Sequence, residues 1–434
     1  MKKNLLYFLT LVLALRMGIF ASGFQLNEHG ARAMGMAGAF AGVANDPSTI
    51  YFNPAGLTNL RGTNFLAGVA LIAPSADFEG PLPSTTKTEQ ESQVFTPINF
   101  YATHSFQNGL SLGLGVNNQY GLGTKWPNDW VGRYLAVETE ITAFYFTPVV
   151  AYKISDVFSI GVGAVIALAD VTIINNIPLQ DPVTGQLLPD GRVELNGDAT
   201  SFGFSAGIFV KPSDVISFGV SYRSENEFDF EGDAATTPAT LDFTHPIAGS
   251  QSIPLPHGAV KAPLTTPQNL TVGVGLYPSN DLTISADFQW VGWSSYDKLE
   301  ITFEEYDLDP TTPEQENVET AIRNYEDSFI IRMGAEYLIS PEFALRGGLF
   351  YDNNPVKDNY VEPTLPDADR YGINIGFGYN FSPALRVDLA YLLLLFSERE
   401  VTDSEFSLPD GTKFNGTYQN TAHLFGVNFS YAIN

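Results

Sequence analysis

Long stretches of this chain alternate between large apolar residues and small or polar residues with a period of two, and this pattern constrains the fold most. In 371–381, glycine or asparagine separates six large apolar residues, which are Tyr371, Ile373, Ile375, Phe377, Tyr379 and Phe381. Because successive side chains of a β-strand point to opposite faces, such a segment forms a strand with one apolar face. In a soluble β-sandwich the other face would be richly charged, whereas here it is small and polar. That combination is typical of a transmembrane β-barrel, which presents apolar side chains to lipid.

Fourteen segments alternate in this way, and short turns and long connections separate them in regular succession. The predicted strands are residues 63–73, 93–105, 109–121, 138–154, 157–173, 198–211, 215–231, 264–278, 281–303, 326–339, 342–353, 369–381, 384–406 and 416–433. Outer-membrane barrels have an even number of antiparallel strands, short periplasmic turns and long extracellular loops. The sequence therefore predicts an all-β, 14-stranded antiparallel transmembrane β-barrel over residues 63–434, with both ends of the barrel chain on the periplasmic side.

The N-terminus carries the features of an export signal. Lys2 and Lys3 form a basic region, Leu5–Leu15 is apolar, and small residues follow from Ala21. A transmembrane helix needs about 20 apolar residues, so this segment is too short to serve as an anchor. We expect residues 1–21 to be a cleaved signal peptide that exports the chain. Together with the predicted barrel, export places the mature chain in the cell outer membrane of a Gram-negative bacterium.

Composition excludes several classes of function. The chain has 48 acidic residues against 22 Lys and Arg, a formal charge of −26, so nucleic acid is a poor partner. It has no cysteine, which excludes disulfides and thiolate chemistry, and its five histidines are not spaced as a metal-binding pair. A G-x-S-x-G match at 203–207 lies within strand alternation rather than in a strand–turn–helix elbow. The sequence thus predicts no catalytic residue, no metal site and no cofactor, and the chain is not expected to be an enzyme.

Residues 22–62 precede the first predicted strand and show no alternation. They are rich in glycine and alanine, and they contain the tetrapeptide Asn53, Pro54, Ala55 and Gly56. Such a segment is either a periplasmic tether or a plug inside the barrel. Small residues permit close packing against a barrel wall, which favours the plug.

Several short motifs resemble those of a known family. They are residues 23–28 (GFQLNE), 45–48 (NDPS), 53–57 (NPAGL), 129–134 (DWVGRY), 222–225 (YRSE), 290–293 (WVGW) and 365–370 (LPDADR). Each motif is weak alone, but together and in this order the chain resembles the FadL/TodX-type outer-membrane transporters of long-chain fatty acids and other hydrophobic compounds. The resemblance implies a 14-stranded barrel, an N-terminal hatch over residues 22–62 that plugs it, and a kinked third strand that opens the wall sideways.

The third predicted strand contains the segment where such a kink is expected. Leu110, Leu112, Leu114 and Val116 form one apolar face, and alternation then breaks at five residues, which are Asn117, Asn118, Gln119, Tyr120 and Gly121. A polar run facing lipid would be unfavourable, so the strand should bend inward there. We expect these five residues to form the lateral opening that the resemblance implies.

Charged residues of the predicted strands share the inward parity. They are Arg223, Asp287, Arg332, Glu336, Arg346, Arg370, Arg386 and Asp388. A charge facing lipid at mid-depth costs about 2–4 kcal/mol, so inward placement is expected. These residues either form a salt-bridge network that holds the hatch to the wall or contact substrate directly.

Two further sets of residues concern the ligand. The predicted loop 232–263 is unusually apolar, and we expect substrate capture by Leu241, Phe243, Ile247, Ile253 and Leu255. Fatty-acid transporters of the family place bases near the outer ends of the fifth and ninth strands. In this chain Lys298 is the candidate for the head group of a bound acid.

Three functions remain open from the sequence. The first is a monomeric transporter that moves long-chain fatty acids or other hydrophobic molecules by passive diffusion, with outer-membrane lipid and lipopolysaccharide around it. A variant of this function transports neutral aromatic or alkane hydrocarbons. The alternative is a polar general porin. The acidic segment 304–319 is either a solvated loop or a site where divalent cations bridge to lipopolysaccharide.

Overall fold

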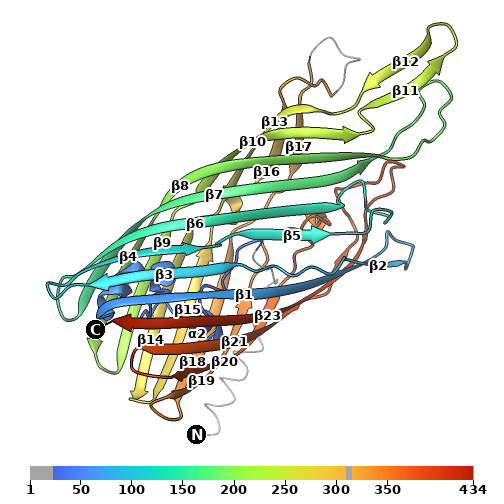
Figure 1. Ribbon diagram of the computed structural model, residues 1–434. Helices are drawn as coiled ribbons and strands as arrows, with labels where there is room; N and C mark the ends of the chain where they lie inside the picture. Colours follow the sequence, from blue (N-terminus) through green and yellow to red (C-terminus); the bar gives the residue numbers. More distant parts are fainter. Residues whose placement is uncertain (1–22, 309–314, 434) are drawn as a thin grey trace.

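The computed structural model describes residues 23–308 and 315–433, and the predicted signal peptide lies outside this range. Figure 1 shows a single closed β-barrel whose neighbouring strands are antiparallel. The first strand, β1 (Gly62–Glu79), pairs along its whole length with the last, β23 (Gly416–Ile433), from Thr63 opposite Ile433 to Glu79 opposite Thr417. This pairing removes the free sheet edges and closes the fourteen-stranded barrel that alternation predicts.

Several of the fourteen barrel strands are divided into two segments. The remaining strand segments of the barrel are β3 (Ile98–Ser105), β4 (Leu110–Asn117), β5 (Gly121–Lys125), β6 (Glu138–Lys153), β7 (Phe158–Ile177), β8 (Gly191–Ser213), β9 (Ile216–Arg223), β10 (Asn226–Thr237), β13 (Gly258–Thr266), β14 (Asn269–Ser279), β15 (Leu282–Val291), β16 (Lys298–Phe303), β17 (Val318–Ile322), β18 (Ser328–Leu338), β19 (Phe343–Asp352), β20 (Arg370–Asn380), β21 (Leu385–Phe396) and β22 (Arg399–Val401). Outside the barrel wall lie β2 (Lys87–Glu89), which pairs antiparallel with the end of β1, and the hairpin of β11 (Thr240–His245) and β12 (Gly249–Pro254).

The extracellular part contains more strand than the sequence predicts. Strands β7 and β8 pair as far as Ile177 opposite Gly191, so the predicted loop 174–197 is mostly a continuing ladder. The predicted loop 232–263 likewise contains the end of β10, the β11–β12 hairpin and the start of β13. Above the membrane neither face meets lipid, so backbone pairing continues without the apolar alternation on which the prediction depended.

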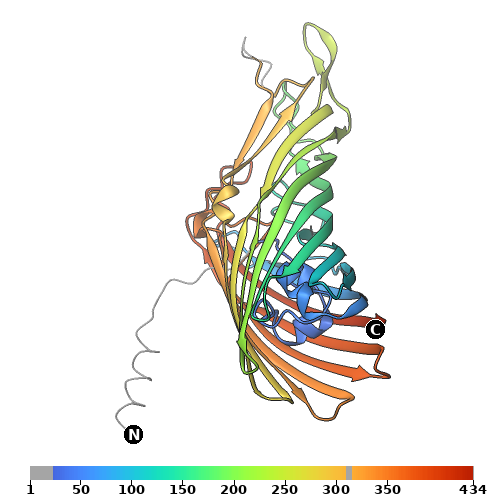
Figure 2. The same ribbon diagram turned by 90° about the vertical axis from the view of Figure 1, so that its left-hand side faces the viewer.

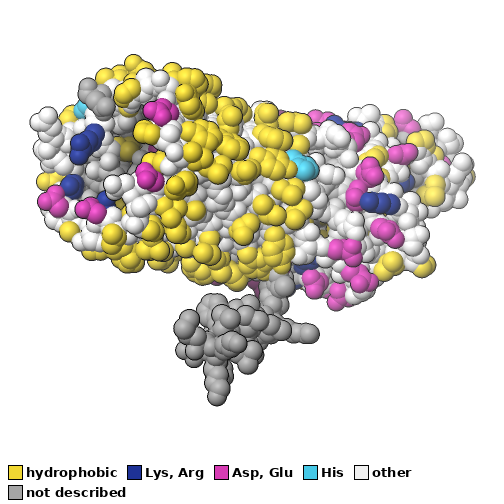
Figure 3. All heavy atoms as spheres, turned by 90° about the horizontal axis from the view of Figure 1, so that it is seen from below, with side chains coloured by type: hydrophobic (Ala, Val, Ile, Leu, Met, Phe, Trp, Pro, Cys, Tyr) yellow, Lys and Arg dark blue, Asp and Glu magenta, His cyan; other side chains and the backbone are white. Residues whose placement is uncertain are grey.

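The outer surface carries the apolar face of the strands. In β20 the alternating residues Ile373, Ile375 and Phe377 are exposed, while Gly372 and Asn374 face inward. In Figure 3 hydrophobic side chains form a broad continuous band over one half of the molecule, and acidic side chains gather beyond it. The band is the surface expected to meet lipid. Within the described residues no helix is long and apolar enough to cross a bilayer.

Residues 23–61, called the lumenal segment below, lie inside the barrel. They form three short helical pieces, which are α2 (Ala31–Gly35), α3 (Thr49–Phe52) and the 3₁₀ helix η1 (Pro54–Asn59). The helix α2 packs against β19, β20, β21 and β23, and η1 packs against β6, β7 and β8. Figure 2 shows this segment, in blue, enclosed by the strands near the end of the barrel where the chain terminates.

Two further 3₁₀ helices interrupt the barrel chain on the extracellular side. They are η2 (Trp293–Ser295), which lies between β15 and β16, and η3 (Asp358–Tyr360), which lies in the connection from β19 to β20. Figure 1 shows the β11–β12 hairpin projecting furthest from the barrel on the same side.

Candidate functional site

Glycines of the barrel wall make room for the lumenal segment. A methyl group at Gly219 would overlap the carbonyl oxygen of Ala41, and one at Gly334 would overlap that of Met36. In β7, a methyl group at Gly161 would lie 2.5 Å from the carbonyl carbon of Pro54. The inward face of the strands therefore carries small residues where backbone meets backbone, which explains the small members of the alternating pattern.

Asn53 joins the lumenal segment to the wall. Its side chain is fully buried, and its amide nitrogen donates to the carbonyl oxygens of Ala41 at 3.1 Å and of Ile208, in β8, at 3.0 Å. Its side-chain oxygen accepts from the backbone nitrogen of Ala55 at 3.2 Å, which caps η1. Pro54 has no N–H and its ring fixes φ, so it suits the first position of this helix. The two N–H groups of the Asn53 amide match its two acceptors, and its oxygen accepts a third bond, so the side chain holds residues 41–55 together and to β8.

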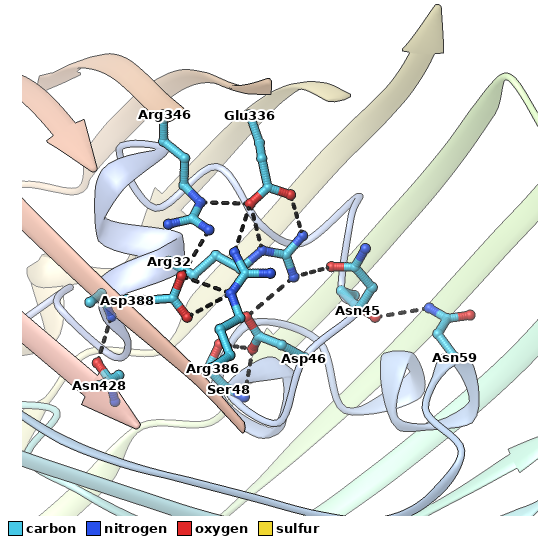
Figure 4. A network of polar contacts seen from close by, with 12 residues as sticks. Arg32, Asn45, Asp46, Ser48, Asn59, Glu336, Arg346, Arg386, Asp388 and Asn428 are labelled. Atoms are coloured by element: carbon cyan, nitrogen blue, oxygen red, sulfur yellow. Dashed lines mark hydrogen bonds and ion pairs between the residues drawn. The ribbon is translucent and has the colours of Figure 1, made fainter. Parts of the chain in front are cut away.

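An ion-pair network fastens the other side of the lumenal segment (Figure 4). Arg32, from α2, donates to both carboxylate oxygens of Glu336, in β18, at 2.7 and 2.9 Å. Arg346 pairs with Glu336 at 2.6 Å and with Asp388 at 2.8 Å, and Arg386 pairs with Asp388 at 2.9 Å. Each buried charge therefore has an oppositely charged partner, and the network links α2 to β18, β19 and β21.

The other inward charges also contact the lumenal segment or the wall. Arg223 donates to the carbonyl oxygen of Tyr51 at 2.7 Å, and Asp287 accepts from the backbone nitrogens of Phe40 and Ala41, both at 2.8 Å. Arg332 donates to Asn27 at 2.9 Å, and Arg370 pairs with Asp352 at 3.0 Å. All eight charged residues identified from strand parity therefore face inward, and none of these contacts requires a ligand.

Arg32 and Asp46 belong to the same network but escape sequence reasoning. Arg32 lies 3.5 Å from Asp46, and both come from the lumenal segment. That segment has no periodic pattern, so nothing in the sequence distinguishes these two charges from solvated ones.

The third barrel strand is interrupted where its alternation breaks. Asn117 at the end of β4 lies opposite Tyr145 of β6, whereas Gly121 at the start of β5 lies opposite Thr142. Three residues, 118–120, thus face only two residues of β6, so the strand bulges and its facing reverses.

The bulge bends toward the lumenal segment. The backbone nitrogen of Leu26 donates to Gln119 at 2.9 Å, and that of Gly121 donates to Phe24 at 3.1 Å. The polar residues of the bulge are buried, and Asn118 donates to the carbonyl oxygen of Ala143 at 2.8 Å. The unpaired backbone of the third strand is therefore satisfied inside the barrel rather than exposed to lipid.

A cavity of about 600 Å³ lies beside this interruption and is called the wall cavity. Its lining includes buried residues of the interior, such as Phe24 and Tyr120, and exposed residues of the outer face, such as Ile98 and Phe144. Because side chains of one strand alternate between faces, a cavity lined by both sets extends through the wall. The ring of Phe95 lies against Gly123 within it, in a position that a side chain at 123 would occupy.

A second cavity of about 630 Å³ lies on the extracellular side and is called the outer cavity. Most of its lining is apolar, and the strands that contribute to it include β7, β8, β13, β16 and β17. Four residues line both cavities, which are Phe24, Leu122, Ile141 and Leu365. The two cavities therefore meet at an apolar boundary that contains a residue of the lumenal segment.

The predicted ligand residues lie apart from this cavity. The β11–β12 hairpin contains four of the five predicted capture residues, and none of the four lines the outer cavity; they are Leu241, Phe243, Ile247 and Ile253. The fifth, Leu255, is buried at the base of the hairpin. Leu299 and Ile301 of β16 do line it, so the alternating Lys298 points away, and it pairs with Glu300 at 2.7 Å. The base that does line the cavity is Arg323, which follows β17.

The comparisons with known proteins agree with this architecture. The model of the family described as Outer membrane protein transport protein (OMPP1/FadL/TodX) matches residues 12–433. The chain belongs to this family. The long-chain fatty acid transport protein of Salmonella typhi is 25% identical over 433 residues, which cover 95% of both chains. Outer membrane protein P1 of Haemophilus influenzae is 23% identical and covers 96% of both.

Solved structures of similar proteins have the same fold. A FadL homologue from Pseudomonas aeruginosa superposes with a TM-score of 0.79 at 21% identity, covering 94% of this chain and 99% of the other. The toluene transporter TodX of Pseudomonas putida superposes with a TM-score of 0.73 at 15% identity, covering 94% and 99%. This protein of the FadL/TodX family is thus an outer-membrane transporter of a Gram-negative bacterium and not an enzyme.

Proposed function

We propose that this protein carries long-chain fatty acids or other hydrophobic molecules across the outer membrane by passive diffusion, with capture outside, an internal apolar pocket and lateral release through the third strand. The observation that carries the proposal is the pair of apolar cavities that meet at Phe24, Leu122, Ile141 and Leu365. A hydrophobic solute crosses the polysaccharide layer poorly but dissolves readily in a bilayer. A protected apolar route that ends in the bilayer would therefore suffice.

The first step of the route is capture in the outer cavity. Its lining is mostly apolar and comes from the extracellular side, so a ligand leaving the aqueous phase there would meet apolar side chains before it meets lipid. The exposed apolar residues of the β11–β12 hairpin, with Ile247 93% exposed, would make the earlier and weaker contact.

The second step is passage along the boundary into the wall cavity. The carbonyl oxygen of Phe24 accepts a hydrogen bond from the backbone nitrogen of Gly121. Its ring packs edge-on against those of Trp293 and Tyr296, with ring centres 4.9 and 6.0 Å away. We infer that movement of this ring relative to Leu122 and Leu365 connects the two cavities. Asn117, Asn118, Gln119, Tyr120 and Gly121 then form the lateral opening.

The lumenal segment would act as the hatch that excludes axial passage. Asn53, Pro54, Ala55 and Gly56 are packed against β7 and β8, and the network of Figure 4 fastens the opposite side. With both sides fastened, a ligand leaves through the wall more easily than through the periplasmic end. The surrounding partners would then be outer-membrane lipid and lipopolysaccharide, around a monomer.

A polar general porin is the alternative function, and conductance separates the two. In planar bilayers the purified protein should give no steady large conductance, because residues 23–61 fill the lumen. A variant lacking residues 23–60 should conduct if the barrel remains closed. A steady large conductance of the intact protein would contradict the proposal.

A further inference from the structure

The charges around the outer cavity are unusual for a site that binds an acid. Among its lining residues, all in the described part of the chain, Arg323 is the single base, whereas Glu319, Glu362 and Glu405 are acidic. The lining thus carries one positive and three negative formal charges when the acids are ionised.

Arg323 is already occupied by a carboxylate of the protein. It forms an ion pair with Glu362, and the two side chains are only 10% and 12% exposed. The guanidinium also lies 6.0 Å from the ring centre of Tyr296. A buried pair of this kind is retained because either charge alone would be strongly unfavourable.

The backbone holds both members of the pair in place. The backbone nitrogen of Arg323 donates to Asp297 at 2.8 Å, and that of Asn324 donates to the same oxygen at 2.7 Å. Glu362 lies at a turn in which the nitrogen of Leu365 donates to its carbonyl oxygen at 3.3 Å. These bonds fix the backbone positions of Arg323 and Glu362, and the low exposure of the two side chains keeps them together in the pair.

A ligand carboxylate in this cavity would have to compete with Glu362. If it displaced Glu362, the carboxylate of Glu362 would be left without its cation in an apolar cavity. If it did not, the ligand carboxylate would itself have no cation in a lining that carries more acidic than basic groups. A hydroxyl group or a bare hydrocarbon meets neither penalty, because it carries no charge.

We propose that Glu362 is a specificity-determining residue that makes the outer cavity select neutral hydrophobic molecules over carboxylates of the same chain length. The proposal rests on the proposed function, and it assigns to that function a class of ligand. Arg323 positions Glu362 and supplies the charge that an acid could use only when Glu362 is neutralised.

The test compares oleate with oleyl alcohol, which share one chain and differ in the charged group. Equilibrium dialysis of the purified full-length protein in detergent at pH 8 should give wild-type affinity at least about 10-fold higher for the alcohol. Glu362→Gln frees the Arg323 charge, so oleate affinity should rise about 10-fold while alcohol affinity changes less than about twofold. The double variant Glu362→Gln, Arg323→Gln should lose that gain.

Glu342→Gln is the matched control, because Glu342 lies in an exposed periplasmic turn and should leave both affinities unchanged. Tight wild-type binding of oleate relative to the alcohol would overturn the proposal, and so would an equal shift of both ligands in Glu362→Gln. Failure of a folded wild-type protein to bind either ligand would instead contradict the proposed function.

Discussion

Replacing Asn53 by alanine should loosen the lumenal segment and leave the barrel intact. The substitution removes the partner of three backbone groups, which are the carbonyl oxygens of Ala41 and Ile208 and the nitrogen of Ala55. An unsatisfied buried group costs about 1–3 kcal/mol, and water entering the new space would satisfy part of the loss. We therefore expect the docked state of the segment to lose about 3–4 kcal/mol.

Native-state hydrogen exchange measures this loss directly. A loss of about 3 kcal/mol corresponds to more than a 100-fold rise in exchange for amides that open only when the segment undocks, such as Asn53 and Gly56. Amides of β20 and β21 should be unaffected, because β-barrel pairing does not depend on the segment.

Asn380→Ala provides the control. Asn380 is also an asparagine that donates to a backbone carbonyl, at 3.0 Å to Pro341, but it lies at the end of β20 and its partner precedes β19. Unchanged exchange in Asn53→Ala, or an equal rise in the barrel strands, would refute the reasoning that this side chain fastens the segment to β8.

Three further predictions follow from the same structure. Gly219→Val should displace Ala41 and destabilise the docked lumenal segment by about 3 kcal/mol or more. Gly347→Val is the control, because a side chain at 347 would meet open space. Similar hydrogen exchange of the lumenal segment in the two variants would contradict the role of the wall glycines. Phe95→Ala removes the ring that lies against Gly123. Release of bound ligand into lipid vesicles, followed by stopped flow, should become about threefold to tenfold faster. An unchanged rate would show that the ring does not limit exit. Burial raises the pKa of Asp367 to about 6, against the opposing charge of Arg370, and it raises the pKa of Asp369 to about 7, against the hydrogen bond from Tyr351. Arg399 opposes both shifts, and Asp352 adds to both. Because both folded-state pKa values exceed the ordinary value of 3.8, protonation of these carboxyl groups favours the folded loop 353–369. The protection of this loop from hydrogen exchange, corrected for the intrinsic rate, should therefore increase as pH falls from 8 to 5. A decrease would contradict the raised pKa values of Asp367 and Asp369.

The barrel itself could be predicted from the sequence because lipid imposes a strict rule on the outer face. The residues of 371–381 alternate without exception, and they form β20 with the expected facing. The same rule gave the inward charges, since a charge such as Arg346 has no acceptable position on the lipid side.

The parts beyond the membrane could not be predicted in the same way. No solvent constraint distinguishes the two faces of β8 near Gly191, so its pairing with β7 leaves no periodic signal. Lys298 follows the 3₁₀ helix η2, and nothing in the sequence indicates which face of β16 it would take after that interruption. Arg323 and Glu362 lie far apart in sequence and meet only because two extracellular connections fold over the same cavity.

Lateral release is tested most directly by locking the wall and the lumenal segment separately. The chain has no cysteine, so engineered pairs react cleanly. Phe95→Cys with Gly123→Cys, joined by a short bis-methanethiosulfonate reagent that releases sulfinate and leaves a reducible linker, closes the wall cavity. Thr58→Cys with Ser159→Cys, at positions whose hydroxyl oxygens lie 2.7 Å apart, is joined by the same reagent and fastens the segment to β7. The account predicts that transfer of oleyl alcohol into the surrounding vesicle lipid stops when the wall is locked and continues when the lumenal segment is locked. Reduction of the linker in the wall-locked variant should restore transfer in full. Continued transfer with the wall locked, or loss of transfer only when the segment is locked, would contradict it.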